Sequence, residues 1–237
     1  MLKAHAYIDG FSLYKGALEK RPQFKWLNLV SFCESRMPNS RIEKIYYFTA
    51  RIKSRYPGDE AHNRQHKYLR VLKDQGIEIV EGKFLKDSDW MRIVEPSIGT
   101  ITDPQLPQFF GLTKYGIKKI FSEMVPDVPK SFVWKYGEKG SDVNLASYLL
   151  RDIYTAGLDS ALVISGDSDL ATPIRIAKDR GVLLQTLHPR KGAGSSELRA
   201  ASTKFEELHP GWLAAHVHPR SYITGNGGNI VRPEEWA

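Results

Sequence analysis

The stretch SALVISGDSDLATPIRIAKDRGV, residues 160–182, decides the fold of this chain. Its first part, residues 160–165, is an apolar run that predicts a buried strand inside a parallel sheet. Asp167 and Asp169 follow directly, so two like charges stand where the strand ends. Side by side they repel, which is costly unless a metal ion, a basic side chain or water lies between them.

Strands and helices alternate along most of the chain. This alternation predicts an α/β protein with a mainly parallel central sheet that helices flank. We expect strands over 3–9, 41–50, 77–85, 131–135, 160–165 and 182–187, and helices over 12–20, 27–36, 59–76, 141–157, 171–181 and 195–208. We expect Ser141 to cap its helix, and Val143 to lie on the inner face of that helix.

Two segments depart from the regular alternation. Residues 86–130 carry many prolines and aromatic residues, which predicts an ordered but irregular insert. Residues 207–237 are rich in glycine at their end and are expected to form a C-terminal tail that lies over a neighbour or is partly mobile. The expected organisation is therefore one domain over 1–206, interrupted by the insert, and a tail.

The composition limits the kind of protein. The chain has 237 residues, 41% hydrophobic and 11% aromatic, which is enough for an ordinary core. A net charge of +7 and an isoelectric point near 9.3 favour an anionic partner such as nucleic acid. Cys33 is the single cysteine, which excludes an internal disulfide and a cysteine-rich zinc site. With no leader sequence and no apolar run of about 20 residues, we expect a cytoplasmic protein without a membrane span.

Four carboxylates follow three separate strands. Asp9 ends the first strand, Asp142 starts the helix after 131–135, and Asp167 and Asp169 follow the buried strand. Ligands of open parallel sheets bind beyond the carboxyl ends of the strands, so these side chains can meet at one edge. Carboxylates without histidine or cysteine suit Mg²⁺ or Mn²⁺. Taken singly, each acid also fits a helix cap, a turn former or an Asx turn.

Three blocks together resemble one family. YIDGFSLY (7–14), EKGSDVNLASYLLRDIY (138–154) and ALVISGDSDLATPIRIAKDRGV (161–182) are similar in order and spacing to the NYN domain family of PIN-like nucleases. The resemblance spans residues 3 to 206 and implies a Rossmann-like PIN fold, a divalent metal and RNA cleavage. It places the metal-binding and catalytic acids on Asp9, Asp142, Asp167 and Asp169, with Ser165 beside them and Lys139 near a bound phosphate.

Two positions depart from the family pattern. Ser12 stands where the family usually has asparagine, and Thr203 stands near the position of a further aspartate in many relatives. Ser12 keeps a hydrogen-bonding group and remains a candidate substrate-binding residue. His188 and Arg190 follow the strand 182–187 at the same edge of the sheet, and they are further candidates for substrate binding.

The preferred function is a Mg²⁺- or Mn²⁺-dependent endoribonuclease with RNA as partner. One alternative is an RNA-binding regulatory module with weak catalysis. Another is an NADH-dependent monooxygenase of a pyridine-type aromatic, an activity also described for relatives of this family. Against it, the sequence contains no dinucleotide fingerprint. Because the insert and tail expose aromatic residues, we also expect a homodimer.

Overall fold

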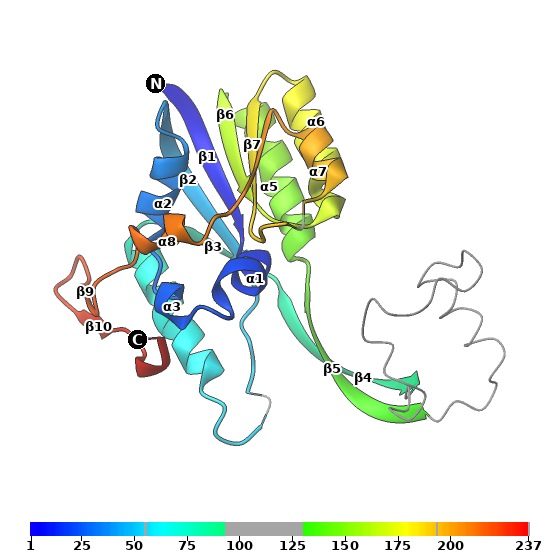
Figure 1. Ribbon diagram of the computed structural model, residues 1–237, viewed down its shortest axis with the longest axis vertical. Helices are drawn as coiled ribbons and strands as arrows, with labels where there is room; N and C mark the ends of the chain where they lie inside the picture. Colours follow the sequence, from blue (N-terminus) through cyan, green and yellow to red (C-terminus); the bar gives the residue numbers. More distant parts are fainter. Residues whose placement is uncertain (55, 93–129, 193, 237) are drawn as a thin grey trace. The chain divides into compact units, whose positions relative to one another are not determined.

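The computed structural model describes residues 1–54, 56–92, 130–192 and 194–236 (Figure 1). The chain forms two compact units, one of Met1–Phe84 with Glu138–Ala237 and the other of Leu85–Gly137. The whole of the expected insert, residues 86–130, falls in the second unit, and its residues 93–129 lie outside the described residues. Two paired strands, β4 (Lys83–Arg92) and β5 (Lys130–Lys139), connect to it.

The larger unit is built on a six-stranded sheet in the order β3-β2-β1-β6-β7-β8. Every neighbouring pair in this sheet is parallel, so the carboxyl ends of all its strands lie at one edge. This confirms the expected α/β fold with a parallel central sheet. Its strands are β1 (Leu2–Asp9), β2 (Ser40–Thr49), β3 (Glu78–Glu81), β6 (Ser160–Ile164), β7 (Leu183–His188) and β8 (Lys204–Glu207).

Helices cover both faces of the sheet (Figure 1). Strand β1 alternates accordingly: Ala6 and Ile8 join the apolar core on the side of α2 and α3, while Tyr7 joins the core on the side of α5 and α6. Burial of each large apolar side chain in these two cores contributes about 1.5–3 kcal/mol. The helices are α1 (Gly10–Leu13), α2 (Leu29–Arg36), α3 (Ala61–Asp74), α5 (Ser141–Thr155), α6 (Ala171–Asp179), α7 (Ser196–Ala201) and α8 (Gly211–Ala214).

Short helical turns complete the larger unit. The segment after α1 is a π-helix, η1 (Tyr14–Leu18), rather than a continuous α-helix over 12–20. The turn that carries the aspartate pair is a short 3₁₀ helix, η4 (Ser168–Leu170). Two further 3₁₀ turns are η2 (Pro22–Phe24) and η5 (Glu234–Trp236).

The start of α5 differs from the sequence prediction. Gly140, not Ser141, is the N-cap residue, and it takes the left-handed conformation with φ of 90° that favours glycine. Ser141 is the first helical residue and donates its hydroxyl hydrogen to the Glu138 carboxylate instead. Val143 was expected on the inner face, but it is 69% exposed. The rest of the predicted face is largely kept: Leu149 is buried, and Ala146 and Ile153 pack against the same core, which Leu145 also joins.

Two predicted elements are each divided in the structure. The expected strand 77–85 breaks at Gly82 into β3 and β4, which belong to different sheets. The expected helix 195–208 ends at Ala201, and the chain continues as the sheet strand β8. The Ser202 hydroxyl donates to the Leu198 carbonyl oxygen and is also hydrogen-bonded to the Thr186 hydroxyl, which satisfies polar groups where the helix stops.

The C-terminal segment folds against its own chain. It contains a two-stranded sheet, β9 (Ser221–Ile223) with β10 (Asn229–Val231), and belongs to the larger unit. Trp236 packs near Trp26 and Tyr68 at ring-centroid distances of 6.0 and 6.2 Å. The Trp26 indole nitrogen also donates to the Pro219 carbonyl oxygen at 3.1 Å. The expected draped or mobile tail is therefore part of the apolar core of the larger unit.

Candidate functional site

The central residue of the carboxyl edge is Asp9, the last residue of β1. It is 5% exposed, and both of its carboxylate oxygens accept hydrogen bonds. The Ser12 backbone N–H donates to Oδ1 at 2.9 Å, and the Ser165 hydroxyl donates to Oδ2 at 2.8 Å. Asp9 is therefore the N-cap of α1 and is held in one orientation from two sides.

The turn after β6 is tied to α1 and to Asp9 by the same serines. Ser12 Oγ accepts from the Gly166 N–H at 2.8 Å, and Ser165 Oγ accepts from the Asp167 N–H at 3.1 Å. Within the turn, Asp167 Oδ1 accepts from the Asp169 N–H at 3.0 Å. The segment after β6 is thus positioned by hydrogen bonds on both sides, and Ser12 performs a positioning role that serine can fill.

Asp142 enters the site from the first turn of α5. The glycine at position 82 allows this approach, because a Cβ atom there would come within 2.7 Å of the Lys139 carbonyl oxygen and 2.8 Å of Ser141 Oγ. The start of α5 therefore packs directly on the chain after β3. Glu138, which precedes this turn, is half-buried and accepts the Ser141 hydroxyl hydrogen.

The carboxylates of this edge act on one another. Burial raises the pKa of Asp9 to about 6; the hydrogen bonds from Ser12 and Ser165 oppose this shift, and the charges of Asp142 and Asp167 add to it. Burial also raises the pKa of Asp142, with further contributions from Asp167 and Asp169.

Glu138 belongs to the same electrostatic group. Burial raises its pKa, the Ser141 hydrogen bond lowers it, and the charges of Asp9 and Asp142 raise it again. We call Asp9, Glu138, Asp142, Asp167 and Asp169 the acidic cluster. Glu138 was not predicted as a site residue, although it stands one position before Lys139 in the block that carries the family resemblance.

The acidic cluster offers the donor atoms that a hard divalent cation prefers, because all of its possible ligand atoms are carboxylate oxygens. Within the described residues, however, no group of three or more His, Cys, Asp or Glu side chains stands close enough to hold a metal ion. A cation would therefore have to draw carboxylates of the cluster closer together. Repulsion between the carboxylates, which adds to the effect of burial on the pKa of Asp9 and of Asp142, opposes this approach, and the charge of a bound cation would offset it.

Tyr47 and Gly10 pack against each other beside the acidic cluster, and neither was predicted as a site residue. A Cβ atom at Gly10 would come within 2.5 Å of the Tyr47 ring, so the ring packs directly on the start of α1. Burial raises the pKa of Tyr47, and the charges of Asp9 and Glu138 raise it further. Alternation along β2 gives no signal that this particular tyrosine lies beneath the acids.

His188 and Arg190 lie where β7 ends. His188 is 7% exposed, and its Nδ1 is hydrogen-bonded to the backbone of Arg190 at 2.8 Å from the carbonyl oxygen. Its ring packs against Gly166, where a Cβ atom would come within 2.7 Å of Nε2. His188 therefore braces the turn between Ser165 and Asp167, while the side chain of Arg190 is exposed.

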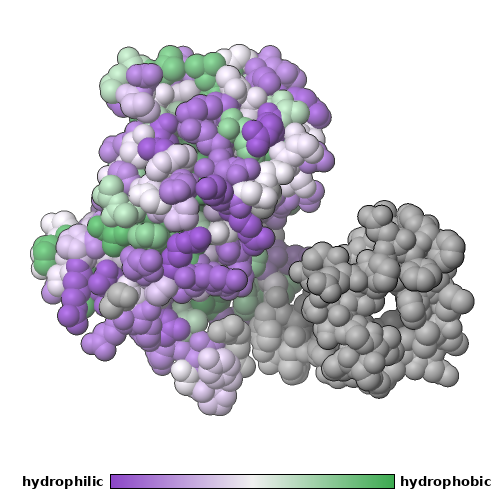
Figure 2. Space-filling view, viewed as in Figure 1, coloured by the Kyte–Doolittle hydropathy of each residue, from purple (hydrophilic) through white to green (hydrophobic). Residues whose placement is uncertain are grey.

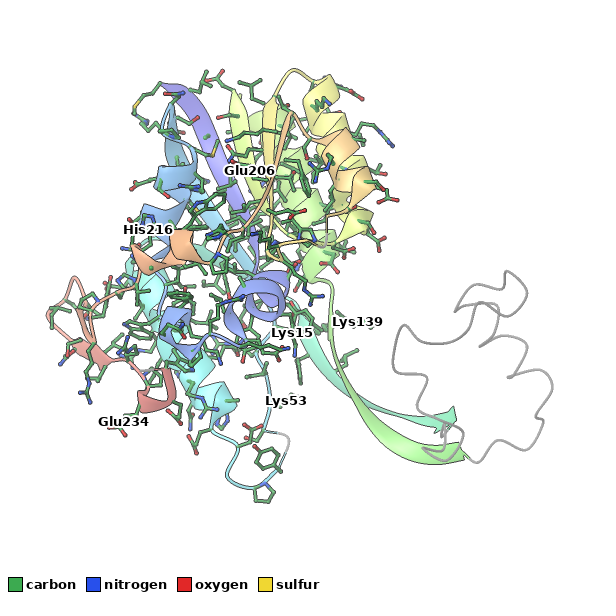
Figure 3. All side chains as sticks on the ribbon, viewed as in Figure 1. Lys15, Lys53, Lys139, Glu206, His216 and Glu234 are labelled. Atoms are coloured by element: carbon green, nitrogen blue, oxygen red, sulfur yellow. The ribbon has the colours of Figure 1, made fainter. Side chains whose placement is uncertain are left out.

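Figure 3 places Lys15, Lys53 and Lys139 at the end of the sheet where β1 terminates. Lys139 is exposed, as a predicted phosphate contact requires.

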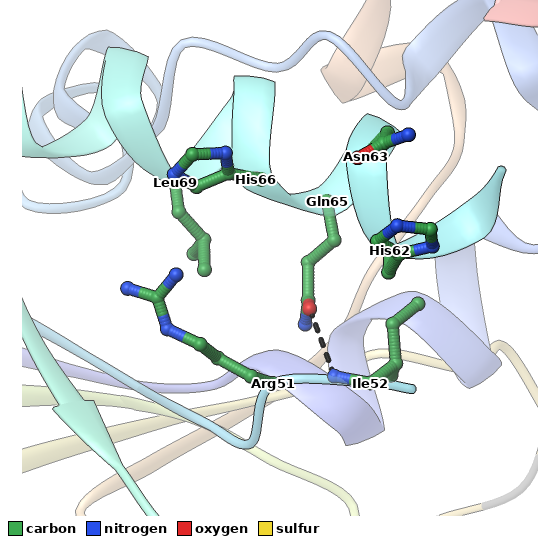
Figure 4. Close-up of a pocket in the computed structure, with 7 residues that line it drawn as sticks. All are labelled: Arg51, Ile52, His62, Asn63, Gln65, His66 and Leu69. Carbon is green, nitrogen blue, oxygen red and sulfur yellow. Dashed lines mark hydrogen bonds between the residues drawn. The ribbon is translucent and has the colours of Figure 1, made fainter. Parts of the chain in front are cut away.

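A pocket of about 230 Å³ lies after the end of β2, and Figure 4 shows its lining. Arg51, on its wall, forms an ion pair with Glu81 at 2.8 Å, so its charge is partly neutralised. Gln65 closes one side: it accepts from the Ile52 N–H at 3.0 Å and donates to the Ala50 carbonyl oxygen at 2.9 Å. The pocket is lined by Arg51, Ile52, His62, Asn63, Gln65, His66 and Leu69.

Comparisons with known proteins agree with the motifs. Residues 105–209 match the NYN domain, a range that includes Asp142, Asp167 and Asp169 but not Asp9. The 6-hydroxy-3-succinoylpyridine 3-monooxygenase HspA of Pseudomonas putida (strain DSM 28022 / S16) is 28% identical over 260 residues, which cover 99% of this chain and 75% of that protein. In the part of the chain that the structure describes, no helix is long and apolar enough to span a membrane.

A solved structure also resembles the chain. It is the crystal structure of a protein of unknown function from Vibrio parahaemolyticus RIMD 2210633, with 14% sequence identity and a TM-score of 0.48. The match covers 88% of this chain and 93% of the other.

Proposed function

We propose that this chain, which matches the NYN domain over residues 105–209, hydrolyses RNA phosphodiester bonds at the acidic cluster with a bound Mg²⁺ or Mn²⁺. The observation that supports this most is the coupling of Asp9 with Asp142 and Asp167. Beyond the effect of burial, the charges of Asp142 and Asp167 raise the pKa of Asp9, and those of Asp167 and Asp169 raise the pKa of Asp142. Acids from three distant segments therefore meet at the carboxyl edge of a parallel sheet, where ligands of this fold class bind.

The buried and the exposed residues of the acidic cluster would have different roles. Asp9 is buried and fixed by Ser12 and Ser165, so it supplies an oriented carboxylate at the floor of the site. Asp142 and Asp169 are exposed at its rim and can move toward a cation. A divalent cation would stabilise the negative charge that develops on the phosphate and lower the pKa of an attacking water.

The basic residues around the cluster would hold the substrate. Lys139 and Arg190 are exposed at the same edge, and the chain as a whole carries a net charge of +7. Phosphate contacts by such residues provide most of the affinity of a protein for nucleic acid and carry little sequence information.

The test is cleavage of labelled RNA with Mg²⁺, with Mn²⁺ and with EDTA. We expect cleavage only with a divalent cation, and a loss of about a hundredfold or more for Asp167→Asn. Asp179→Asn is the matched control, since Asp179 is an exposed carboxylate at the far end of α6. Circular dichroism verifies that both variants fold. Equal cleavage by Asp167→Asn, or full cleavage in EDTA, would contradict the proposal.

One observation favours a second function. HspA, named as a monooxygenase of 6-hydroxy-3-succinoylpyridine, is similar over 99% of this chain. The same scaffold would then oxidise a pyridine-type aromatic with NADH as reductant and O₂ as oxidant. The test is NADH oxidation that depends on a hydroxypyridine substrate, measured on the protein used for the RNA assay. A protein that consumes NADH in this way and leaves RNA intact would replace the nuclease proposal.

Binding without cleavage is the third outcome. A protein that retains RNA in the presence and absence of a cation, and yields no product on long incubation, would act as an RNA-binding module. The acidic cluster argues against this, because uncompensated carboxylates at the floor of an RNA site weaken the binding of phosphate.

A further inference from the structure

Two aromatic side chains stand exposed beside the acidic cluster. Phe11 is 51% exposed and Tyr14 is 37% exposed. They are three residues apart in a helical segment, so they lie on the same face of it. Phe11 lies between Asp9 and Ser12 in the sequence, and both of these neighbours form hydrogen bonds within the site.

The backbone beneath these rings is held firmly. Ser12 donates its N–H to Asp9 and accepts from the Gly166 N–H, so both sides of the α1 turn are fixed. Gly10 lies against the Tyr47 ring without room for a side chain. Little further ordering is therefore needed before a ligand binds the exposed rings.

A lysine ammonium group lies near each of the two aromatic rings. Lys15 Nζ lies 5.9 Å from the centroid of the Phe11 ring, and Lys25 Nζ lies 5.2 Å from the centroid of the Tyr14 ring. Lys15 also pairs with Glu19, which moderates its charge. Exposed aromatic rings interleaved with ammonium groups match the chemistry of unpaired bases joined by phosphates.

A further basic segment reaches the same helix. Gly16 in η1 lies so close to Pro189 that a Cβ atom at Gly16 would come within 2.7 Å of the Pro189 Cβ. The exposed Arg190 follows directly. The π-helical turn and this glycine thus bring the segment after β7 against the helix that carries the rings.

We propose that Phe11 and Tyr14 form a stacking platform for unpaired bases, and that Lys15 and Lys25 bind the phosphates of the same strand. The ligand is single-stranded RNA, because the base faces of a duplex are already stacked and covered. This inference rests on the proposed RNA substrate and adds a selection for single strands over duplex.

The test is binding of a fluorescein-labelled single-stranded 12-mer RNA and of the same sequence in a blunt duplex, measured by anisotropy in EDTA so that no cleavage occurs. For Phe11→Ala with Tyr14→Ala we expect the dissociation constant for the single strand to rise about five- to a hundredfold. The dissociation constant for the duplex should change much less. Phe11→Tyr, which keeps a ring, should retain the affinity of the unmodified protein.

Tyr154→Ala is the matched control. Tyr154 is 57% exposed and lies under the Arg180 guanidinium at 4.4 Å, so it shares the chemistry of the platform but not its location. Lys25→Gln gives an independent measurement, since losing one phosphate contact should lower the slope of log affinity against log salt by about 0.7 for a single strand.

The proposal is overturned if the double variant binds the single strand as the unmodified protein does, if it loses single strand and duplex equally, or if Tyr154→Ala causes the same loss. It is also overturned if the unmodified protein binds no RNA, or if the rings prove to be the contact between two copies of this chain. If the double variant cleaves RNA as the unmodified protein does, only the stacking platform is contradicted. If the protein binds RNA through Phe11 and Tyr14 but never cleaves it, only the proposed nuclease function is contradicted.

Discussion

The Ser165 hydroxyl donates a hydrogen bond to Asp9 Oδ2 at 2.8 Å, although the two residues are 156 positions apart in the chain. They meet because Ile8 and Ile164 are paired in the parallel register of β1 and β6, one residue before each of them. Ser165 is fully buried, so the bond is shielded from water.

We expect Ser165→Ala to lower the free energy of unfolding by about 1–3 kcal/mol, because it leaves a buried carboxylate oxygen without its donor. It should also raise the pKa of Asp9 further, since the serine hydrogen bond opposes the effect of burial. Urea unfolding and NMR titration of the carboxylate measure the two effects. Ser168→Ala, at an exposed position of the same turn, is the control and should leave both unchanged. An equal urea midpoint for the two variants would argue against the role of the bond.

Asp9 predicts a specific pH dependence for the metal-free protein. Its pKa is raised from 3.8 to about 6, so the folded state holds a proton that the unfolded state releases between these values. The free energy of unfolding should therefore fall as pH rises from about 4 to 6, by at most about 3 kcal/mol. Asp9→Asn should remove this decline and raise the melting temperature at pH 7.5 in EDTA. If the variant keeps the full pH dependence, another group is responsible.

Addition of Mn²⁺ or Mg²⁺ should make the unmodified protein more stable than Asp9→Asn, the reverse of the order expected in EDTA. A cation that binds the folded acidic cluster at a hundred times its dissociation constant adds about 2.7 kcal/mol to the stability of the unmodified protein. Asp9→Asn and Asp167→Asn should gain much less, and Asp179→Asn should gain as much as the unmodified protein. Thermal unfolding with and without EDTA measures this. A shift of the same size in all four proteins would indicate that the cation binds elsewhere.

The contact between Gly166 and His188 can be tested by a double-mutant cycle. Gly166→Ala should lower the free energy of unfolding by about 1–3 kcal/mol, because the added methyl group overlaps the imidazole ring. In a His188→Ala background the same substitution should cost less, since the ring is absent. Equal costs in both backgrounds would show that the strain arises from the backbone and not from the ring.

Much of the fold follows from local patterns in the sequence. The apolar run before Ser165 and the polar residues after it identify the central strand and the edge where the site lies. Gly76 and Gly181 end α3 and α6 as predicted, because their positive φ angles stop a helix at these points. These features depend on residues next to each other in the chain.

The remaining features depend on contacts that no local pattern encodes. The stretch that follows Ala201 has helical propensity, but it becomes strand β8 because β7 leaves an edge that can be paired. Glu138 joins the acidic cluster, and Tyr47 packs beside it, through tertiary contacts, so neither was found from spacing. Trp236 was assigned to a tail because a single aromatic residue near a chain end does not identify the partners it packs against.

The close approach of Gly82 to Lys139 means that the polypeptide departs from the larger unit and comes back at nearly one point. The segment between Gly82 and Lys139 is therefore an insertion whose two ends a short turn could connect, as with many inserted modules. The part of it that ends at Gly137 could therefore be replaced by another segment without a change in the strand order of the sheet, and with Glu138 retained the acidic cluster would keep all of its members.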